Sequence, residues 1–185
     1  MSWIKVVDEG EATGELKKVY ERIKKERGKI ANIMKVHSLN PSTMEDHMRL
    51  YRNIMFGSNG LKRDERELLA VVVSALNGCE YCINHHAEAL NHYWKDREKI
   101  QNLIKDYRSV ELPERLKAMI SYAFKLTKTP WEMKEEDVFS LKNTGFSDAD
   151  ILTINLIVSY FNFVNRIALG LGVEFTEDEV TGYRY

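Results

Sequence analysis

Long helical patterns with few interruptions are the feature that most restricts the fold of this chain. Only three prolines occur, at positions 41, 113 and 130, and glycine-rich turns are few. Between these breaks apolar residues return every third or fourth position, the spacing of one helix face. No run of alternating β-branched residues lies between hairpin turns, as it would in a sheet. We therefore predict an all-α fold, a helical bundle. The expected helices cover about residues 13–27, 30–39, 42–56, 62–77, 79–94, 96–107, 114–126, 134–143 and 148–169.

The helix expected at 62–77 is the centre of this bundle. Its stretch from Leu68 to Leu76 is apolar on nearly all sides, which indicates a helix that is buried all round. Asn77 and Gly78 end it, because such residues commonly close helices. The next helix is therefore expected to begin near Cys79.

Two segments of the chain resemble each other weakly. Residues 61–77 and 146–162 line up at a constant offset, and few of their residues match. We predict one domain over residues 1–185, built from two weakly related helical halves. The cysteine-bearing half covers about residues 1–95, and the cysteine-free half covers about 96–185.

Length and charge narrow the function classes. The chain has 185 residues, enough for one domain with its own core. Its hydrophobic fraction of 44% and charged fraction of 30% are typical of soluble globular proteins. A formal net charge of -1 argues against a general nucleic-acid binder and a polybasic membrane binder. We therefore expect neither nucleic acid nor membrane among the partners.

The N-terminal residues bear on the location. No stretch approaches the roughly 18 apolar residues that cross a bilayer. Residues 1–8 contain a short apolar tract, but no basic leader followed by a long hydrophobic block, so no signal peptide is expected. We expect a cytoplasmic protein, in a reducing compartment where disulfide scaffolds are rare.

The chemistry is concentrated around the two cysteines. Cys79 and Cys82 form a CxxC, one helical turn apart, so their sulfurs can face each other. His86 follows Cys82 at i+4, which places an imidazole on the same face to accept the thiol proton. A helix that begins at Cys79 also favours an anionic sulfur near its N-terminus. Glu67 is expensive to bury unless it is paired, but with a break at residue 78 only the fold can bring it close.

A zinc site is the alternative interpretation of this cluster. Cys79, Cys82, His85 and His86 fall within eight positions. Structural zinc usually takes two ligand pairs from separate elements, and no second CxxC or HxxxH is present, although another histidine could contribute. A thioredoxin-type fold needs a βαβ surround that this sequence does not indicate.

Other polar and aromatic residues have plainer interpretations. The remaining histidines are expected at the surface or at helix ends: His37, His47 and His92. Tyr160, Phe161 and Phe163 are expected in the core or as a buried wall beside the thiols. Asn162 and Asn165 lie in the same apolar helix and need hydrogen-bond partners there.

The pattern of Glu67, Cys79, Cys82 and His86, written E-x11-C-x2-C-x3-H, resembles the alkylhydroperoxidase D and carboxymuconolactone decarboxylase superfamily. The surrounding residues are most similar to the branch called peroxidase-related proteins, and the closing stretch 160–168 is also similar. The resemblance covers most of the chain. It implies an all-helical fold and a homo-oligomer, commonly a trimer or hexamer, although a dimer stays open.

The resemblance also implies the roles of the site residues. Cys82 is expected as the peroxidatic thiol and Cys79 as the resolving thiol, with His86 and Glu67 as the proton relay. Family members work without haem or metal, and no GxGxxG or P-loop implies another cofactor. Better-known members carry a histidine between the cysteines, where this chain has Tyr81. That departure puts the detail of the relay in doubt.

Three functions follow as hypotheses. The first is a thiol peroxidase that reduces alkyl hydroperoxides and is regenerated by a dithiol or a thioredoxin-like donor. The second is a thiol–disulfide adaptor that passes electrons to a partner protein. The third is a helical metal-binding module. Members of the superfamily that act as decarboxylases lack the CxxC, so its presence favours redox chemistry.

Overall fold

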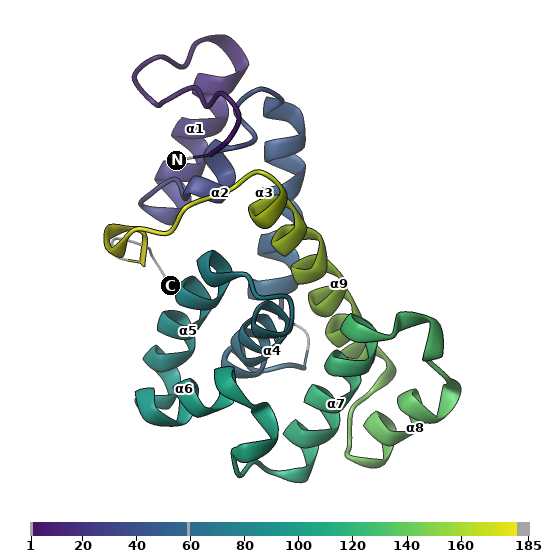
Figure 1. The fold of residues 1–185 in the computed structure, drawn as a ribbon. Helices are drawn as coiled ribbons and strands as arrows, with labels where there is room; N and C mark the ends of the chain where they lie inside the picture. The colour runs from purple at the N-terminus through teal and green to yellow at the C-terminus, as the bar shows by residue number, and fades with distance from the viewer. Residues whose placement is uncertain (1, 59, 181–185) are drawn as a thin grey trace.

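The computed structural model describes residues 2–58 and 60–180, and within them the chain is all-helical with no strand (Figure 1). This confirms the predicted fold class. The nine α-helices of these residues are α1 Gly14–Arg27, α2 Asn32–Lys35, α3 Pro41–Phe56, α4 Arg63–Leu76, α5 Glu80–Trp94, α6 Arg97–Lys105, α7 Glu114–Lys128, α8 Glu135–Asn143 and α9 Asp148–Gly170. The short 3-10 helices are η1 Tyr107–Ser109, η2 Pro130–Glu132 and η3 Glu177–Val180.

Helix α4 is the centre of the bundle, as predicted. Its residues from Glu65 to Ser74 are all buried, because α5, α7 and α9 pack around it (Figure 1). A helix can be apolar on every face only when neighbours cover every face. The position of α4 matters for function, since both the CxxC and Glu67 depend on it.

The hydrophobic core has two parts. The larger cluster surrounds α4 and takes in α5, α7 and α9. The smaller cluster joins α1, α2 and α3. Ile33 and Tyr51 are partly buried and pack against both clusters. The boundary between the two clusters is therefore a place where side chains from both can line a cavity.

A buried arginine fixes the entry into α4. Arg66 is only 1% exposed, and its guanidinium donates to the carbonyls of Ile54, Leu61 and Gly57, the last at 3.0 Å. The carbonyls of a helix end have no partner within the helix. Arg66 supplies one for the end of α3 and so fastens α3 to the start of α4.

The segment expected as a helix over 30–39 is shorter in the structure. Only Asn32–Lys35 is α-helical. Beyond it the backbone hydrogen bonds join residues three positions apart and not four. They run from His37 N to Met34 O at 3.0 Å and from Ser38 N to Lys35 O at 2.9 Å. Bonds of this type tighten the chain into turns and rarely extend far. The prediction of a ten-residue helix here was wrong.

Helix α9 departs from another expectation. It has 23 residues, and by length and mean hydropathy of 1.3 it could cross a membrane. The expectation that no segment approaches that length was therefore wrong for α9. More than half of the most apolar 18-residue stretch of α9 is buried inside the bundle. This is the situation of a core helix and favours a soluble protein.

The two segments that resemble each other in sequence fall on α4 and the first part of α9. These helices pack directly against each other. The division of one domain into two related halves remains a prediction.

Candidate active site

The cysteines lie at the junction of α4 and α5. Gly78 has a φ of +67°, a left-handed conformation that lets the chain leave α4 and turn at once into α5. Cys79 is the N-cap residue of α5, and Cys82 lies in its first turn. The two sulfurs are hydrogen-bonded at 2.9 Å, and both thiols are free. Their exposed fractions are 1% and 3%, so the pair is buried.

The two thiols differ in acidity. The side-chain bond with Cys82 lowers the pKa of Cys79; burial opposes this, and the backbone of Cys82 adds to the lowering. The same side-chain bond, together with burial, raises the pKa of Cys82 well above its usual value. The first negative charge of the pair therefore belongs to Cys79, at the N-terminus of α5, where anions are favoured. Cys82 needs a base to lose its proton.

Glu67 and His86 form a hydrogen-bonded carboxylate–imidazole pair. Helix α4 packs on α5, and Glu67 Oε2 lies 2.6 Å from His86 Nδ1. Glu67 Oε1 pairs with Arg63 Nη2 at 2.6 Å. Glu67 is 0% exposed. Burial alone raises the pKa of its carboxyl, but His86 and Arg63 outweigh burial and hold the pKa below its ordinary value. A carboxylate bonded to one imidazole nitrogen fixes the ring and increases the basicity of the other nitrogen.

A small cavity of about 90 Å³ lies against this group. Cys82, His86 and Glu67 contribute to its lining, whereas its other walls include Met34 and Met48 of the smaller cluster. The cavity therefore lies at the boundary between the two parts of the core. Of the two cysteines, Cys82 is the one that lines it.

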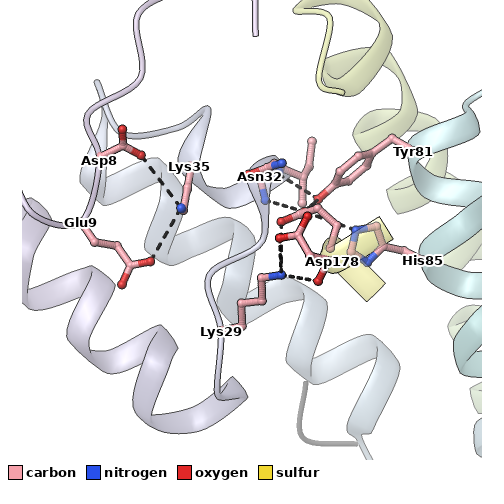
Figure 2. Close-up of polar contacts among 10 residues, drawn as sticks. Asp8, Glu9, Lys29, Asn32, Lys35, Tyr81, His85 and Asp178 are labelled. Atoms are coloured by element: carbon pink, nitrogen blue, oxygen red, sulfur yellow. Dashed lines mark hydrogen bonds and ion pairs between the residues drawn. The ribbon is translucent and has the colours of Figure 1, made fainter. Parts of the chain in front are cut away.

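A second histidine–carboxylate contact lies beside the first. Glu179 of η3 is 3% exposed and accepts from the Tyr81 hydroxyl at 2.8 Å and from Asn32 N at 3.0 Å. His85 Nε2 lies 3.4 Å from the same carboxylate. Lys29 pairs with it and with Asp178 (Figure 2).

This network joins three segments that lie far apart in the sequence, namely α2, the first turn of α5, and η3. The Tyr81 hydroxyl also accepts from Ile33 N at 3.1 Å. Burial raises the pKa of Glu179, but the bonds from His85, Asn32 and Tyr81 bring it below its ordinary value. Burial lowers the pKa of His85. Tyr81 therefore occupies the position between the cysteines as a structural anchor for the segment after α9 (Figures 1 and 2).

Asn165 of α9 is the amide next to the thiols. It is 0% exposed, accepts from Asn77 Nδ2 at 2.9 Å and donates to Ser74 Oγ at 3.1 Å. Its side chain also lowers the pKa of both cysteines by hydrogen bonding. The partners that the sequence demanded for Asn165 are therefore found at the end of α4 and at the CxxC.

One of the three histidines expected at the surface or at helix ends is buried. His47 of α3 is 5% exposed and bonds through Nδ1 to His37 Nε2 at 3.0 Å and through Nε2 to the Tyr160 hydroxyl at 2.6 Å. Burial lowers its pKa to about 3. The prediction for His47 was wrong because the smaller cluster closes over this face of α3. His92 is exposed as expected.

The structure brings together Cys79 with Cys82, and Glu67 with His86. Cys82, Glu67 and His86 line one cavity. His85 faces the separate carboxylate of Glu179. Within residues 2–58 and 60–180, no group of three or more His, Cys, Asp or Glu side chains is arranged to hold a metal ion.

Sequence reasoning missed Arg63 and Glu179. It also missed the hydrogen bond between His47 and the Tyr160 hydroxyl. Arg63 could have been found, since it precedes Glu67 by four positions, the spacing of a helical ion pair. Glu179 lies far along the chain and has no local signal.

Comparisons with known proteins bear on the family and the fold. The model of the carboxymuconolactone decarboxylase family matches residues 41–123, which include the CxxC. An alkyl hydroperoxide reductase AhpD from Streptomyces griseus is 37% identical over 51 residues, which span 28% of this chain and 29% of that protein. The aligned region thus covers less than a third of that relative.

Two of the solved structures that match over nearly the full length are peroxidase-related proteins. One, described as an alkylhydroperoxidase AhpD core and uncharacterized peroxidase-related protein from Ralstonia eutropha JMP134, has a TM-score of 0.87 at 25% identity, covering 97% of this chain and 94% of its own. The other, an uncharacterized peroxidase-related protein from Silicibacter sp. TM1040, has a TM-score of 0.82 at 30% identity, covering 92% and 89%.

The fold is that of the AhpD-like helical proteins, and the chain belongs to the carboxymuconolactone decarboxylase family. Its full-length similarity includes proteins described as peroxidase-related.

Proposed function

We propose that this protein is a thiol peroxidase that reduces organic hydroperoxides with the Cys79–Cys82 pair. The observation that carries the proposal is the short contact of the two sulfurs, 2.9 Å, at a cavity that also holds the Glu67–His86 pair. A nucleophilic thiol, a base and a second thiol are the groups that such a cycle requires.

The first step prepares the nucleophile. His86, oriented by Glu67, accepts the proton of Cys82, whose raised pKa otherwise keeps it a thiol. Arg63 balances the buried carboxylate of Glu67. The roles assigned to Cys82, Cys79, His86 and Glu67 by family resemblance fit this arrangement, because Cys82 faces the cavity and Cys79 lies behind it.

The redox steps follow from the contact between the sulfurs. The Cys82 thiolate attacks the hydroperoxide, the O–O bond breaks, and the products are a Cys82 sulfenic acid and an alkoxide that takes up a proton. The Cys79 sulfur then attacks the Cys82 sulfur, which releases water and forms the disulfide. A dithiol or thioredoxin-like donor supplies the two electrons and two protons that restore both thiols.

Burial favours a small-molecule substrate over a protein acceptor. The sulfurs are nearly inaccessible, and a cavity of about 90 Å³ admits a peroxide group but not a protein surface. A thiol–disulfide adaptor has to present its sulfur to a partner. The adaptor hypothesis is supported only if the protein requires a specific partner protein and shows negligible direct turnover of hydroperoxide.

The test is consumption of cumene hydroperoxide with a small dithiol as reductant, together with mass spectrometry of the protein. We expect wild type to form one intramolecular disulfide, and Cys82→Ser to lose turnover. Cys79→Ser is expected to accumulate the Cys82 sulfenic acid, which trapping reagents detect. Unchanged turnover of cumene hydroperoxide in Cys82→Ser contradicts the proposal. Stoichiometric zinc in the same sample that is lost on Cys79→Ala favours the metal-binding module instead.

We also propose a homo-oligomer. The outward side of α9 exposes large apolar residues, which solvent does not favour over contiguous areas. These residues are Leu152, Leu156, Phe163 and Leu169, with exposed fractions of 60%, 40%, 50% and 45%. Light scattering after size exclusion tests this, and a monomer at micromolar concentration contradicts it. The cytoplasmic location stays a prediction.

A further inference from the structure

A chain of hydrogen bonds crosses the smaller cluster of the core and ends at the cavity. His37 follows α2 and is half-buried, His47 lies on α3, and Tyr160 lies on α9. His37 Nε2 lies 3.0 Å from His47 Nδ1, and His47 Nε2 lies 2.6 Å from the Tyr160 hydroxyl. His47 and Tyr160 are 5% and 6% exposed. Three titratable groups are thus connected from the protein surface inward.

Tyr160 is the inner end of this chain and faces the reacting groups. It lines the same cavity as Cys82. Its neighbour Phe161 packs edge-on against the His86 ring, with centroids 4.6 Å apart. Burial raises the pKa of Tyr160, and the charges of Tyr51 and Cys82 add to this, so Tyr160 keeps its proton at neutral pH.

The proposed peroxidase reaction also has to deliver a proton to the leaving oxygen. Displacement at the O–O bond proceeds in line, so the leaving oxygen lies on the side of the attacked oxygen that is remote from sulfur. His86 follows Cys82 by one turn of α5, so the imidazole that takes the thiol proton lies on the sulfur's side. Protonation of a leaving alkoxide by a positioned acid typically contributes a rate factor of about 10²–10⁴.

We propose that Tyr160 is the catalytic acid that protonates the leaving alkoxide, and that His47 and His37 return a proton to it. This inference rests on the proposed peroxidase function. It adds a proton path that is separate from Glu67 and His86.

The proton count closes. As the Cys82 thiolate takes the nearer oxygen and becomes a sulfenic acid, the leaving oxygen takes the proton of the Tyr160 hydroxyl. The Tyr160 oxygen takes the Nε2 proton of His47, His47 Nδ1 takes the Nε2 proton of His37, and His37 takes one from water. The proton that His86 took from Cys82 is released to water and neutralises the hydroxide left there. Sulfur loses two electrons and the O–O bond gains them.

The histidines suit this task because both are neutral. Burial lowers the pKa of His37 and lowers that of His47 to about 3. A neutral imidazole donates with one nitrogen and accepts with the other. With His47 Nε2–H donating to Tyr160, the hydroxyl hydrogen is available to the cavity.

Other titratable groups surround Tyr160. They are Tyr51 of α3, with ring centroids 5.9 Å apart, Glu67 and Arg63 of α4, and Cys82 and His86 of α5. Arg63 and Glu67 form an ion pair. The proton path from His47 therefore reaches Tyr160 from a direction that this ion pair does not occupy.

The experiment compares two oxidants that differ in leaving group. Cumene hydroperoxide leaves a strongly basic alkoxide, whereas peracetic acid leaves a weakly basic carboxylate that needs no acid. We expect Tyr160→Phe to lower kcat/KM for cumene hydroperoxide by about a hundredfold and to change that for peracetic acid by less than about threefold. His47→Gln should cause the same selective loss, and it serves as a second variant if Tyr160→Phe does not fold.

Tyr81→Phe is the matched control. Tyr81 lines the same cavity, but its hydroxyl bonds to Glu179 and not to the histidines. Its substitution should leave the ratio of the two rates unchanged. Equal losses for both oxidants in Tyr160→Phe, or no loss for either, overturn the role of Tyr160 and leave the proposed peroxidase function standing. Wild-type protein that consumes neither oxidant overturns the proposed function as well.

Discussion

Glu67 and His86 are separated by a helix break, yet Glu67 Oε2 lies 2.6 Å from His86 Nδ1. The contact is made because α4 and α5 pack along each other after the turn at Gly78. Arg63 holds the other carboxylate oxygen at 2.6 Å. The base proposed for Cys82 is thus a product of helix packing and not of local sequence.

Replacing Glu67 by Gln is expected to lower peroxide turnover by about a hundredfold, because the imidazole loses the carboxylate that fixes its orientation. The free energy of unfolding should fall by about 3 kcal/mol, since Arg63 loses the carboxylate that balances its charge. Turnover assays and urea unfolding measure both.

Glu65→Gln is the control for this change. Glu65 lies on the same helix, is buried, and pairs with Arg115 at 3.3 Å, and no contact joins it to the thiols. It should affect stability and leave turnover nearly unchanged. If Glu67→Gln turns over peroxide as fast as Glu65→Gln, the relay is not needed.

Asn165→Ala is expected to make the thiols less acidic. The buried amide lowers the pKa of both Cys79 and Cys82 by hydrogen bonding, so its removal raises both values. The pH at which iodoacetamide reaches half its maximal rate should therefore move upward. Asn162→Ala is the matched control, because Asn162 shares the Asn77 donor with Asn165 but otherwise bonds to Thr127 and to its own helix. An unmoved midpoint in Asn165→Ala contradicts the role.

His47 should make the protein less stable in acid. Its pKa is about 3 in the folded state and about 6.5 in an unfolded chain. Between these values the unfolded chain binds a proton that the folded chain does not, so stability falls as pH falls below about 6.5. From pH 7 to pH 4 this group removes on the order of 3 kcal/mol.

The measurement for His47 is the free energy of unfolding at several pH values. His47→Gln should be less sensitive to acid than wild type over this interval. His92→Gln is the control, since His92 is exposed on α5, and it should keep the wild-type slope. Equal slopes in wild type and His47→Gln contradict the neutral, buried histidine.

Tyr81 and Glu179 should be coupled in stability. Tyr81→Phe removes the donor to Glu179 and the acceptor for Ile33 N, and an unpaired buried polar group costs about 1–3 kcal/mol. In a double-mutant cycle with Glu179→Gln we expect a coupling of about 1 kcal/mol. Tyr93→Phe, an exposed tyrosine on the same helix, should cost nearly nothing. Strictly additive effects of the two variants contradict the contact.

Much of the fold could be predicted from the sequence because helices are local. The bounds of α4 and α5 follow from the apolar run at 68–76 and from Gly78, and the structure agrees within a residue or two. The segment 30–39 was mispredicted since its apolar spacing fits both a helix and a series of turns. Periodicity alone does not separate them.

The candidate site was predictable only in its local part. The sulfur contact follows from spacing within one turn. The buried state of His47, by contrast, depends on Tyr160 of α9 and on the smaller cluster. Glu179 contacts Tyr81 across most of the chain, and no periodicity signals a contact of that kind.

The hydrogen bond from the Tyr81 hydroxyl to Glu179 has an evolutionary consequence. The acid after α9 is useful only where the residue between the cysteines can donate a hydrogen bond to it while also accepting one from Ile33 N. The two positions should therefore covary: a tyrosine between the cysteines should accompany an acidic residue in the segment that returns over α2, and each should drift when the other is lost.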